Sequence, residues 1–281
     1  MKIAISSDSS LDLSEELIKE FDIHVVPFSI IMGEEVFLDG DISSDEIFAF
    51  TDKTGKLART SAVNQKQCED HFISLLKEYD EIIHFTISSD MSGSYQNACK
   101  AGEITGHVHV IDSRSLSTGV GLQVIYAAKL AKAGLEVEEI VKKVEERRPF
   151  VQASFAIEAV NYLHKGGRCS AVAALGANVL HIRPQIVVKD GKMGAGKKFR
   201  GPMIKWVKEY VKTTLDEFNN PDHSLIFITT SGASDEVIAW TKNRLLEAGF
   251  KRIEVTRAGC TVSCHCGPGT LGILYFNDGE H

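Results

Sequence analysis

The segment EIIHFTISSDMSGS, residues 81–94, decides the fold class of this chain of 281 residues. Residues 81–87 form a short apolar run of the kind that is buried in a parallel sheet. A loop rich in hydroxyl groups follows at 88–94, and the residues after it have the spacing of a helix. Because strands that alternate with helices form parallel sheets covered on both faces, the segment predicts an α/β fold.

Strands and helices alternate in the same way through the rest of the first half. We expect strands at 2–6, 23–32 and 108–111, and helices at 13–21, 64–79, 117–133 and 137–147. Gly33 predicts a hairpin between 23–32 and 36–38, and Ser43 with Glu46 predicts a capping box before another helix. The first half is therefore expected to be an α/β domain with a parallel sheet, over residues 1–150.

The order of elements changes after Pro149, which must end the helix at 137–147. Strands are expected at 151–156, 184–193, 225–229, 252–257 and 272–276, with helices at 171–181, 202–218 and 235–248. Asp190 and Gly191 mark a hairpin turn. A pattern that combines hairpins with strand–helix–strand units predicts a mixed sheet, so we expect a second α/β domain over 151–281.

Composition and charge exclude several classes of protein. Hydrophobic residues make up 43% and charged residues 25%, which is typical of a globular protein and excludes a disordered chain. No stretch approaches the ~18 apolar residues of a membrane span, and the N-terminus lacks the features of a signal peptide. The six cysteines lack CxxC pairs, so we expect reduced thiols and a cytoplasmic protein. A net charge of −7 disfavours nucleic acid as a partner.

Three loops at expected strand ends, residues 6–10, 88–94 and 112–117, are rich in hydroxyl groups. Thr60 and Ser61 lie in a fourth loop before another expected helix. The carboxyl ends of parallel strands meet at one edge of the sheet, where hydroxyl groups and the free N–H groups of helix N-termini form an anion site. The alternative is that each hydroxyl only caps its helix, a position that Ser and Thr favour.

Two segments of the second half carry further groups that suit an anion. Residues 162–168 place two glycines before Arg168, and residues 259–269 contain three cysteines around His265. We interpret 259–269 as a glycine-rich turn between strands with buried thiols, and His265 as a hydrogen-bond donor to an anion. Its candidate metal ligands are too crowded in sequence to close a tetrahedral zinc site. The basic stripe at 197–201 is interpreted as a solvated face.

Motifs of common enzyme classes are missing from the sequence. There is no GxSxG and no HExxH, and residues 191–198 resemble a Walker loop but have Lys198 where Ser or Thr is required. Residues 267–272 spell GxGxxG but lead into an expected strand, whereas the dinucleotide fingerprint opens a helix. Hydrolases, kinases and dinucleotide-dependent enzymes therefore have little motif support.

Seven segments, taken in order, resemble the DegV family of bacterial fatty-acid-binding proteins. They run nearly the full length of the chain, at 3–9, 60–61, 87–98, 110–113, 163–168, 182–184 and 265–269. The chain departs from the family pattern at Ala62 and Val63, where the family commonly has Gln-Pro, and at Ser94, where the family has Thr. The second change keeps the hydroxyl group.

The resemblance implies a two-domain α/β fold and a non-enzymatic carrier. Such a carrier holds one long-chain fatty acid, for example palmitate, stearate or oleate, between its domains and needs no cofactor or metal. It presents the carboxylate to a fatty acid kinase that makes acyl phosphate for phospholipid synthesis. We also expect transient contact with a membrane surface.

The resemblance also implies roles for individual residues. Contacts to the carboxylate are carried over to Thr60 or Ser61, to Ser92 with the Gly93 N–H, and to His265. Arg168 and Arg200 fall at positions linked to the head-group end and to docking of the kinase.

The residues alone leave alternatives open. The first is an enzyme of phosphoryl or acyl transfer that acts on a small anionic metabolite, with His265 and the Ser92–Gly93 loop as its site. The second is a regulatory or scaffold protein, which would have no closed apolar cavity. Residues 171–180, which are small and apolar, line the acyl tail in one interpretation and form ordinary core in the other.

Overall fold

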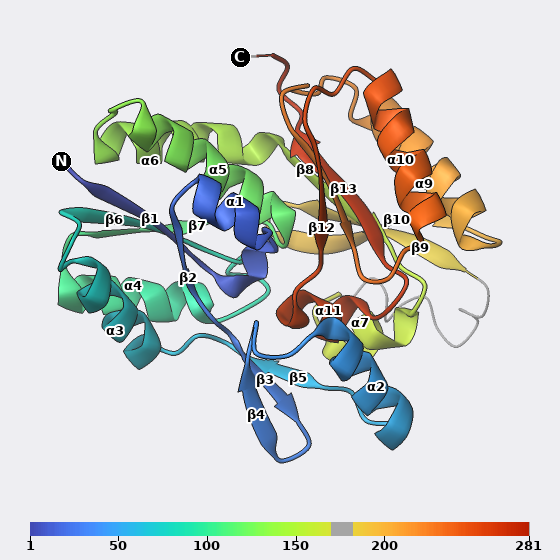
Figure 1. The fold of residues 1–281 in the computed structure, drawn as a ribbon, viewed down its shortest axis with the longest axis horizontal. Coiled ribbons are helices and arrows are strands. Elements are labelled where there is room, and N and C mark those ends of the chain that lie inside the picture. The colour runs from blue at the N-terminus through green and yellow to red at the C-terminus, as the bar shows by residue number, and fades with distance from the viewer. Residues whose placement is uncertain (170–181, 281) are drawn as a thin grey trace.

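The computed structural model describes residues 1–169 and 182–280 of the chain. The helix expected at 171–181 lies outside the described residues. Three sheets organise the described part: a four-stranded sheet in the first half, a six-stranded sheet in the second half, and a three-stranded sheet at the bottom of Figure 1.

The four-stranded sheet is parallel, with the strand order β2-β1-β6-β7. Its strands are β1 (Ile3–Asp8), β2 (Ile23–Val26), β6 (Glu81–Thr86) and β7 (Val108–Asp112). Helices α3 (Gln65–Leu75) and α4 (Ser94–Thr105) cover one face. Helices α1 (Glu15–Glu20), α5 (Thr118–Lys132) and α6 (Val137–Arg147) cover the other. The parallel α/β arrangement predicted for the first half is confirmed.

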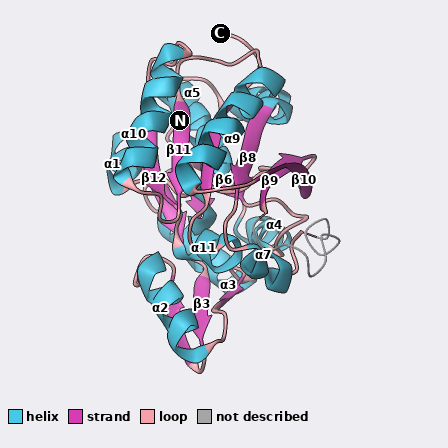
Figure 2. Ribbon diagram, turned by 90° about the vertical axis from the view of Figure 1, so that its right-hand side faces the viewer, coloured by secondary structure: helices cyan, strands magenta, loops and turns pink. Residues whose placement is uncertain are grey.

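The six-stranded sheet is mixed, with the strand order β10-β9-β8-β13-β11-β12. Its strands are β8 (Val151–Ala156), β9 (Arg183–Lys189), β10 (Lys192–Phe199), β11 (Ile226–Thr230), β12 (Ile253–Arg257) and β13 (Leu271–Phe276). Of these strands only β11 and β12 pair in parallel. Helices α9 (Met203–Glu217) and α10 (Asp235–Glu247) cover the face away from α5 (Figure 2). The predicted mixed sheet is confirmed.

The three-stranded sheet is antiparallel and joins the two halves of the chain. It consists of β3 (Ser29–Met32), β4 (Glu35–Leu38) and β5 (Arg59–Ser61), in the order β4-β3-β5. Helix α2 (Ser44–Thr54) follows the hairpin and begins with the expected capping box. Helix α11 (Cys260–Cys266) packs against β3, β5, α2 and α7 (Val160–Gly166). Residues from the second half therefore complete the core of a sheet that belongs to the first half.

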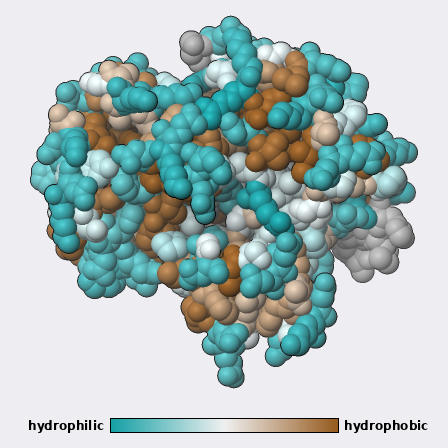
Figure 3. Space-filling view, viewed as in Figure 1, coloured by the Kyte–Doolittle hydropathy of each residue, from teal (hydrophilic) through white to brown (hydrophobic). Residues whose placement is uncertain are grey.

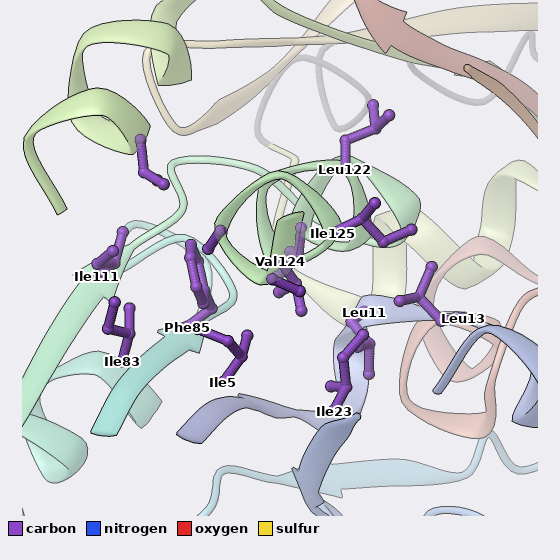
Figure 4. Packing of buried hydrophobic residues seen from close by; sticks show 14 of the residues in the cluster. Ile5, Leu11, Leu13, Ile23, Ile83, Phe85, Ile111, Leu122, Val124 and Ile125 are labelled. Atoms are coloured by element: carbon purple, nitrogen blue, oxygen red, sulfur yellow. The ribbon is translucent and has the colours of Figure 1, made fainter. Parts of the chain in front are cut away.

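Helix α5 lies in the core between the two large sheets. It is buried on all sides because small and apolar residues occupy nearly every position from Thr118 to Ala128. Figure 4 shows Val124 of this helix beside Ile5 and Phe85 of the parallel sheet, and Ile125 on the side toward Leu13. The same cluster includes Phe227, Leu274 and Phe276 of the mixed sheet. The two halves thus share one continuous core.

The prediction of a single strand at 23–32 is wrong. Pro27 divides it into β2, which belongs to the parallel sheet, and β3, which belongs to the three-stranded sheet. Proline has no N–H to donate to a neighbouring strand and its φ is fixed, so strand pairing is interrupted at this position. The chain changes direction here and carries Phe28 into the molecular interior.

Two loops expected from the sequence are also ordered elements. Thr60 and Ser61 are strand residues of β5, not a loop. Residues 259–269 are not a simple turn, since Cys260–Cys266 form the helix α11. Its first backbone N–H groups donate to the carboxylates of Asp12 and Asp39, which lie more than 200 positions earlier in the chain. These distant caps replace the local signals that mark most helix starts.

Among residues 1–169 and 182–280, no helix has the length and apolar character required to cross a membrane. Hydrophilic residues cover most of the face in Figure 3, and hydrophobic ones gather in separate patches. One patch lies at the bottom over the β3–β4 hairpin, where Val36 and Leu38 are exposed.

Candidate ligand-binding site

A cavity lies between the two halves of the chain, where β5, α4, α5, α7 and α11 converge on the ends of β11 and β13. It holds about 970 Å³ of empty space, its open mouth included. Much of the wall is apolar, with the side chains of Met91, Leu116, Phe155, Leu163, Met193 and Leu274.

Thr60 and His265 meet at this cavity although 205 positions separate them in the sequence. Thr60 Oγ1 is hydrogen-bonded to His265 Nε2 at 2.9 Å. β5 presents Thr60 to the interior because the side chains of a strand alternate between its two faces. His265 lies in the last turn of α11, on the face that also carries Thr261 and Val262 into the cavity.

The His265 imidazole is neutral at physiological pH. Burial, and to a lesser extent the nearby positive charge of Arg168, lower its pKa to about 4. Its second nitrogen, Nδ1, is buried without a hydrogen-bond partner and lies against Gly166. The ring therefore acts as a neutral hydrogen-bonding group whose position is fixed by close packing.

Ser92 and Gly93 line the same cavity at the N-terminus of α4. Ser92 Oγ accepts a hydrogen bond from the Ser94 N–H at 3.2 Å and also contacts Ser94 Oγ. Gly93 is the N-cap residue of α4 and has no side chain of its own to cap the helix. The positive end of the helix dipole thus faces the cavity, which favours a negatively charged group.

Of the remaining predicted residues, Arg168 lies at the cavity, whereas Ser61 and Arg200 do not line it. Arg168 is exposed at the cavity, and its Nη1 donates to the Gly166 carbonyl oxygen at 2.7 Å. Ser61 is exposed on the opposite face of β5 from Thr60 and does not line the cavity. Arg200 is exposed after β10, as expected for the basic stripe, and also lies outside the cavity lining.

The hydroxyl-rich segment 6–10 does not belong to the cavity wall. Ser6 and Ser7 lie in β1, and Ser6 Oγ is hydrogen-bonded to His71 Nε2 and His84 Nδ1 at 2.7 and 3.0 Å. Asp8 accepts from the Ile87 N–H at 2.9 Å. These polar groups organise the ends of β1 and β6, so their role is structural.

Asp12 and Asp39 are site residues that the sequence did not reveal. Asp12 Oδ1 accepts from the Gly259 N–H at 2.9 Å, and Asp39 accepts from the Cys260 and Thr261 N–H groups at 2.9 and 3.2 Å. Both carboxyl groups therefore hold the N-terminus of α11 and, through it, His265. Burial raises the pKa of Asp12 to about 8. Their function depends on a contact across the chain, which no local motif signals.

The described residues contain no group of three His, Cys, Asp or Glu side chains arranged to bind a metal ion. The thiols of Cys260, Cys264 and Cys266 are buried, and burial raises the pKa of each. Buried thiols of this kind behave as small apolar side chains.

A family model and a relative that match this chain both belong to the DegV family. The chain matches the family model described as "uncharacterised protein, DegV family" over residues 2–278. A DegV domain-containing protein of Caldanaerobacter subterraneus subsp. tengcongensis is 32% identical over 279 residues, which are 98% of each chain.

Two solved structures have the same fold. A DegV family protein from Thermus thermophilus, described as fatty-acid-binding, superposes with a TM-score of 0.91 at 26% identity, over 98% of this chain and 99% of that one. A stearic acid-binding protein from Eubacterium ventriosum superposes with a TM-score of 0.85 at 26% identity, over 98% of both chains. Since the family model covers residues 2–278 and a relative above 30% identity spans nearly the whole chain, this chain belongs to the DegV family.

Proposed function

We propose that this chain is a carrier that binds one long-chain fatty acid in the cavity. The carboxylate lies at Thr60, His265, Ser92 and the Gly93 N–H, and the tail runs along the apolar wall. The observation that carries this proposal is the hydrogen-bonded pair of Thr60 and a neutral, buried His265 at a largely apolar cavity. The fatty acids bound by the relatives from Thermus thermophilus and Eubacterium ventriosum support it.

The energetics explain why such a carrier needs polar groups as well as an apolar wall. Burial of about 14 methylene groups at ~0.8 kcal/mol each is worth roughly 11 kcal/mol relative to water. A bilayer offers the tail nearly the same free energy, so the wall alone does not extract the acid from a membrane. A buried carboxylate is costly without hydrogen-bond donors. The groups around the head therefore decide whether the acid stays in the protein.

In this proposal the chain performs no chemistry and presents the carboxylate to a fatty acid kinase. Ser92 Oγ contacts Ser94, and His265 contacts Thr60, so within the described residues Ser92 is not paired with a histidine base, as the transferase alternative at the Ser92–Gly93 loop would require. We assign residues 1–150 and 151–281 to two domains that enclose the ligand between them. The carrier works in the cytoplasm and contacts the membrane surface transiently when it loads or unloads.

The direct test is to identify the ligand of the purified protein. Native mass spectrometry should show one fatty acid per chain, and organic extraction should release it for identification. A protein that contains no lipid and takes up neither added palmitate nor oleate would contradict the proposal. Turnover of a small metabolite by the chain alone would favour a transferase instead.

Presentation of the acid to the kinase is tested separately, by substitution of the exposed Arg200. Arg200→Ala should leave the amount of bound fatty acid unchanged and reduce phosphorylation of that acid by the kinase, because Arg200 lies outside the cavity wall. Lys198→Ala, which changes a neighbouring exposed charge, serves as the control. An equal loss of bound lipid in the Arg200 variant would place this residue in the pocket.

A further inference from the structure

Thr261 carries an unusual hydroxyl group in the cavity wall. The residue is 4% exposed, it lines the cavity, and its Oγ1 is buried without a hydrogen-bond partner. Leaving a buried hydroxyl unpaired costs about 1–3 kcal/mol. Among the described hydroxyl groups that line the cavity, this is the one with no hydrogen bond. The hydroxyl groups of the other lining residues all have partners, and these residues are Thr60, Ser92, Ser117, Thr229, Thr230, Ser231 and Thr270.

The position of Thr261 in its helix explains why the hydroxyl is unpaired. Threonines within the longer helices donate to the carbonyl oxygen four residues earlier, as Thr105 does to Ala101 and Thr241 does to Val237, at 2.9 and 2.8 Å. For Thr261 the residue four positions earlier is Arg257, which belongs to β12 and precedes the helix. No helical carbonyl group is therefore available to Thr261.

Hydrogen bonds from the backbone around Thr261 hold this residue in its place at the cavity wall. Asp39 Oδ2 accepts the Thr261 N–H at 3.2 Å, and Asp12 Oδ1 accepts the Gly259 N–H two residues earlier at 2.9 Å. Both carboxyl groups are themselves held by hydroxyl donors, Ser9 and Ser117. Thr261 is thus fixed at the wall, and rotation about its Cβ–Oγ1 bond turns the hydroxyl hydrogen toward the partner that a ligand offers.

We propose that Thr261 selects a long-chain acid that carries a hydroxyl group on the part of the chain nearer the carboxylate. The inference rests on the proposed function and names the class of acid. Thr261 precedes His265 by four residues, so the two side chains share one face of α11 and are about 6 Å apart along its axis. A ligand hydroxyl at this point both donates and accepts, and it satisfies the Thr261 hydroxyl, which an unsubstituted chain leaves unpaired.

The test compares octadecanoic acid with its derivatives hydroxylated on the third, fifth, seventh or twelfth carbon. Dissociation constants are measured for the delipidated wild type, for Thr261→Val, and for Thr241→Val as a matched control. Valine keeps the shape of threonine and removes the hydroxyl; Thr241 is buried in α10, away from the cavity. The wild type should bind one of the first three hydroxy acids about tenfold more tightly than the plain acid, the value of one such hydrogen bond.

Thr261→Val should abolish this preference and Thr241→Val should keep it. Equal binding of plain and hydroxylated acids by the wild type would overturn the proposal, as would a gain confined to the twelfth carbon. An equal loss for all acids in Thr261→Val would also overturn it, since Thr261 would then contact the carboxylate itself. Binding of the plain acid to the wild type reports separately on the proposed function, because that function fails only if no acid binds.

Discussion

At the scale of single residues, the neighbours Thr60 and Ser61 occupy different environments: Thr60 lies at the cavity and Ser61 at the surface. They are neighbours in β5, and Thr60 is bonded to His265 while Ser61 is exposed. We expect Thr60→Val to weaken fatty-acid binding about tenfold, because a hydrogen bond to a charged group is worth ~1.5–3 kcal/mol. Ser61→Ala should bind normally. Isothermal titration with oleate measures both.

The two variants must differ for the assignment of Thr60 to hold. Equal affinities in Thr60→Val and the wild type would remove Thr60 from the head-group site. A loss in Ser61→Ala alone would mean that the other face of β5 meets the carboxylate.

Gly166 is the second informative residue, because it leaves room for His265. A Cβ atom at this position would lie 2.6 Å from His265 Nδ1, which is closer than non-bonded atoms approach. Gly166→Ala should therefore displace the imidazole and weaken fatty-acid binding about tenfold, the value of one hydrogen bond to the carboxylate.

The control for this prediction is Gly194→Ala in β10. An added Cβ there meets only the Val187 carbonyl oxygen, at 3.8 Å, so binding should not change. Normal affinity in Gly166→Ala would show that His265 does not need its present position to hold the ligand.

The sequence predicted some of these residues and missed others for identifiable reasons. Thr60, Ser92 and His265 stand in segments whose composition or family resemblance is visible in the chain, and the structure brings them to one cavity. Asp12 and Asp39 look like ordinary loop acids. Their role depends on contact with α11, more than 200 positions away, and short-range patterns do not contain that information.

At the scale of elements, the loop that carries Ser92 and Gly93 is held by a cluster centred on Arg114. Arg114 Nη1 donates to Asp90 at 2.6 Å, and its Nη2 donates to the Asp190 carbonyl oxygen in the β9–β10 turn. Ser88 Oγ donates to the Gly191 carbonyl oxygen at 2.7 Å. These bonds fix the N-terminus of α4 against a hairpin of the second half.

We expect Arg114→Gln to loosen this loop and to weaken binding of the carboxylate. A partly exposed ion pair is worth up to ~1 kcal/mol, so the affinity for oleate should fall about fivefold. Affinity for oleyl alcohol, which has the same tail and no negative charge, should not change. Titrations with both ligands separate a head-group effect from a general loss of structure.

The matched control is Arg244→Gln in α10, a half-exposed arginine that pairs with Glu247; this variant should bind both ligands normally. If the affinity for the alcohol fell as much as that for the acid in Arg114→Gln, the arginine would stabilise the whole cavity instead of the loop.

The short elements β5 and α11 are the ones that local sequence patterns do not predict. Strands and helices of the two large sheets follow from periodicity, because each buries one regular face. β5 has three residues and α11 has seven, which is too short for a periodic signal, and both are stabilised by contacts with each other's half of the chain. The third sheet was missed for this reason, although the β3–β4 hairpin was predicted.

At the scale of the whole molecule, the shared core around α5 makes the stability of the two halves interdependent. Asp12 lies beside this core at the junction of Ser117 in the first half and Gly259 in the second. Its ionisation therefore affects the stability of the entire fold. Burial raises its pKa from 3.8 to about 8, so the folded protein holds a proton that the unfolded chain releases.

This shift predicts that the contribution of Asp12 to the stability of the fold falls as the pH rises from about 4 to about 8. A group with a raised pKa stabilises the fold most at low pH, and the contribution is lost as the pH rises through the folded value. The pKa values of buried His71 and His265 are lowered to about 4, so their contribution is complete above pH 6.5 and does not oppose the loss. The free energy of unfolding should fall by about 2 kcal/mol between pH 6.5 and about 8.

Urea denaturation of the delipidated protein at several values in this pH range measures the slope, and Asp12→Asn tests its source. Asparagine tolerates the left-handed backbone of this position, where φ is 51°, and keeps an oxygen for the Gly259 N–H. The variant should lose the slope, whereas Asp52→Asn on the exposed face of α2 should retain it. A wild type whose stability is constant from pH 6.5 to 8 would mean that Asp12 is already ionised in the folded state. The junction between the two halves would then rest on a buried charge that the surrounding N–H and hydroxyl donors stabilise.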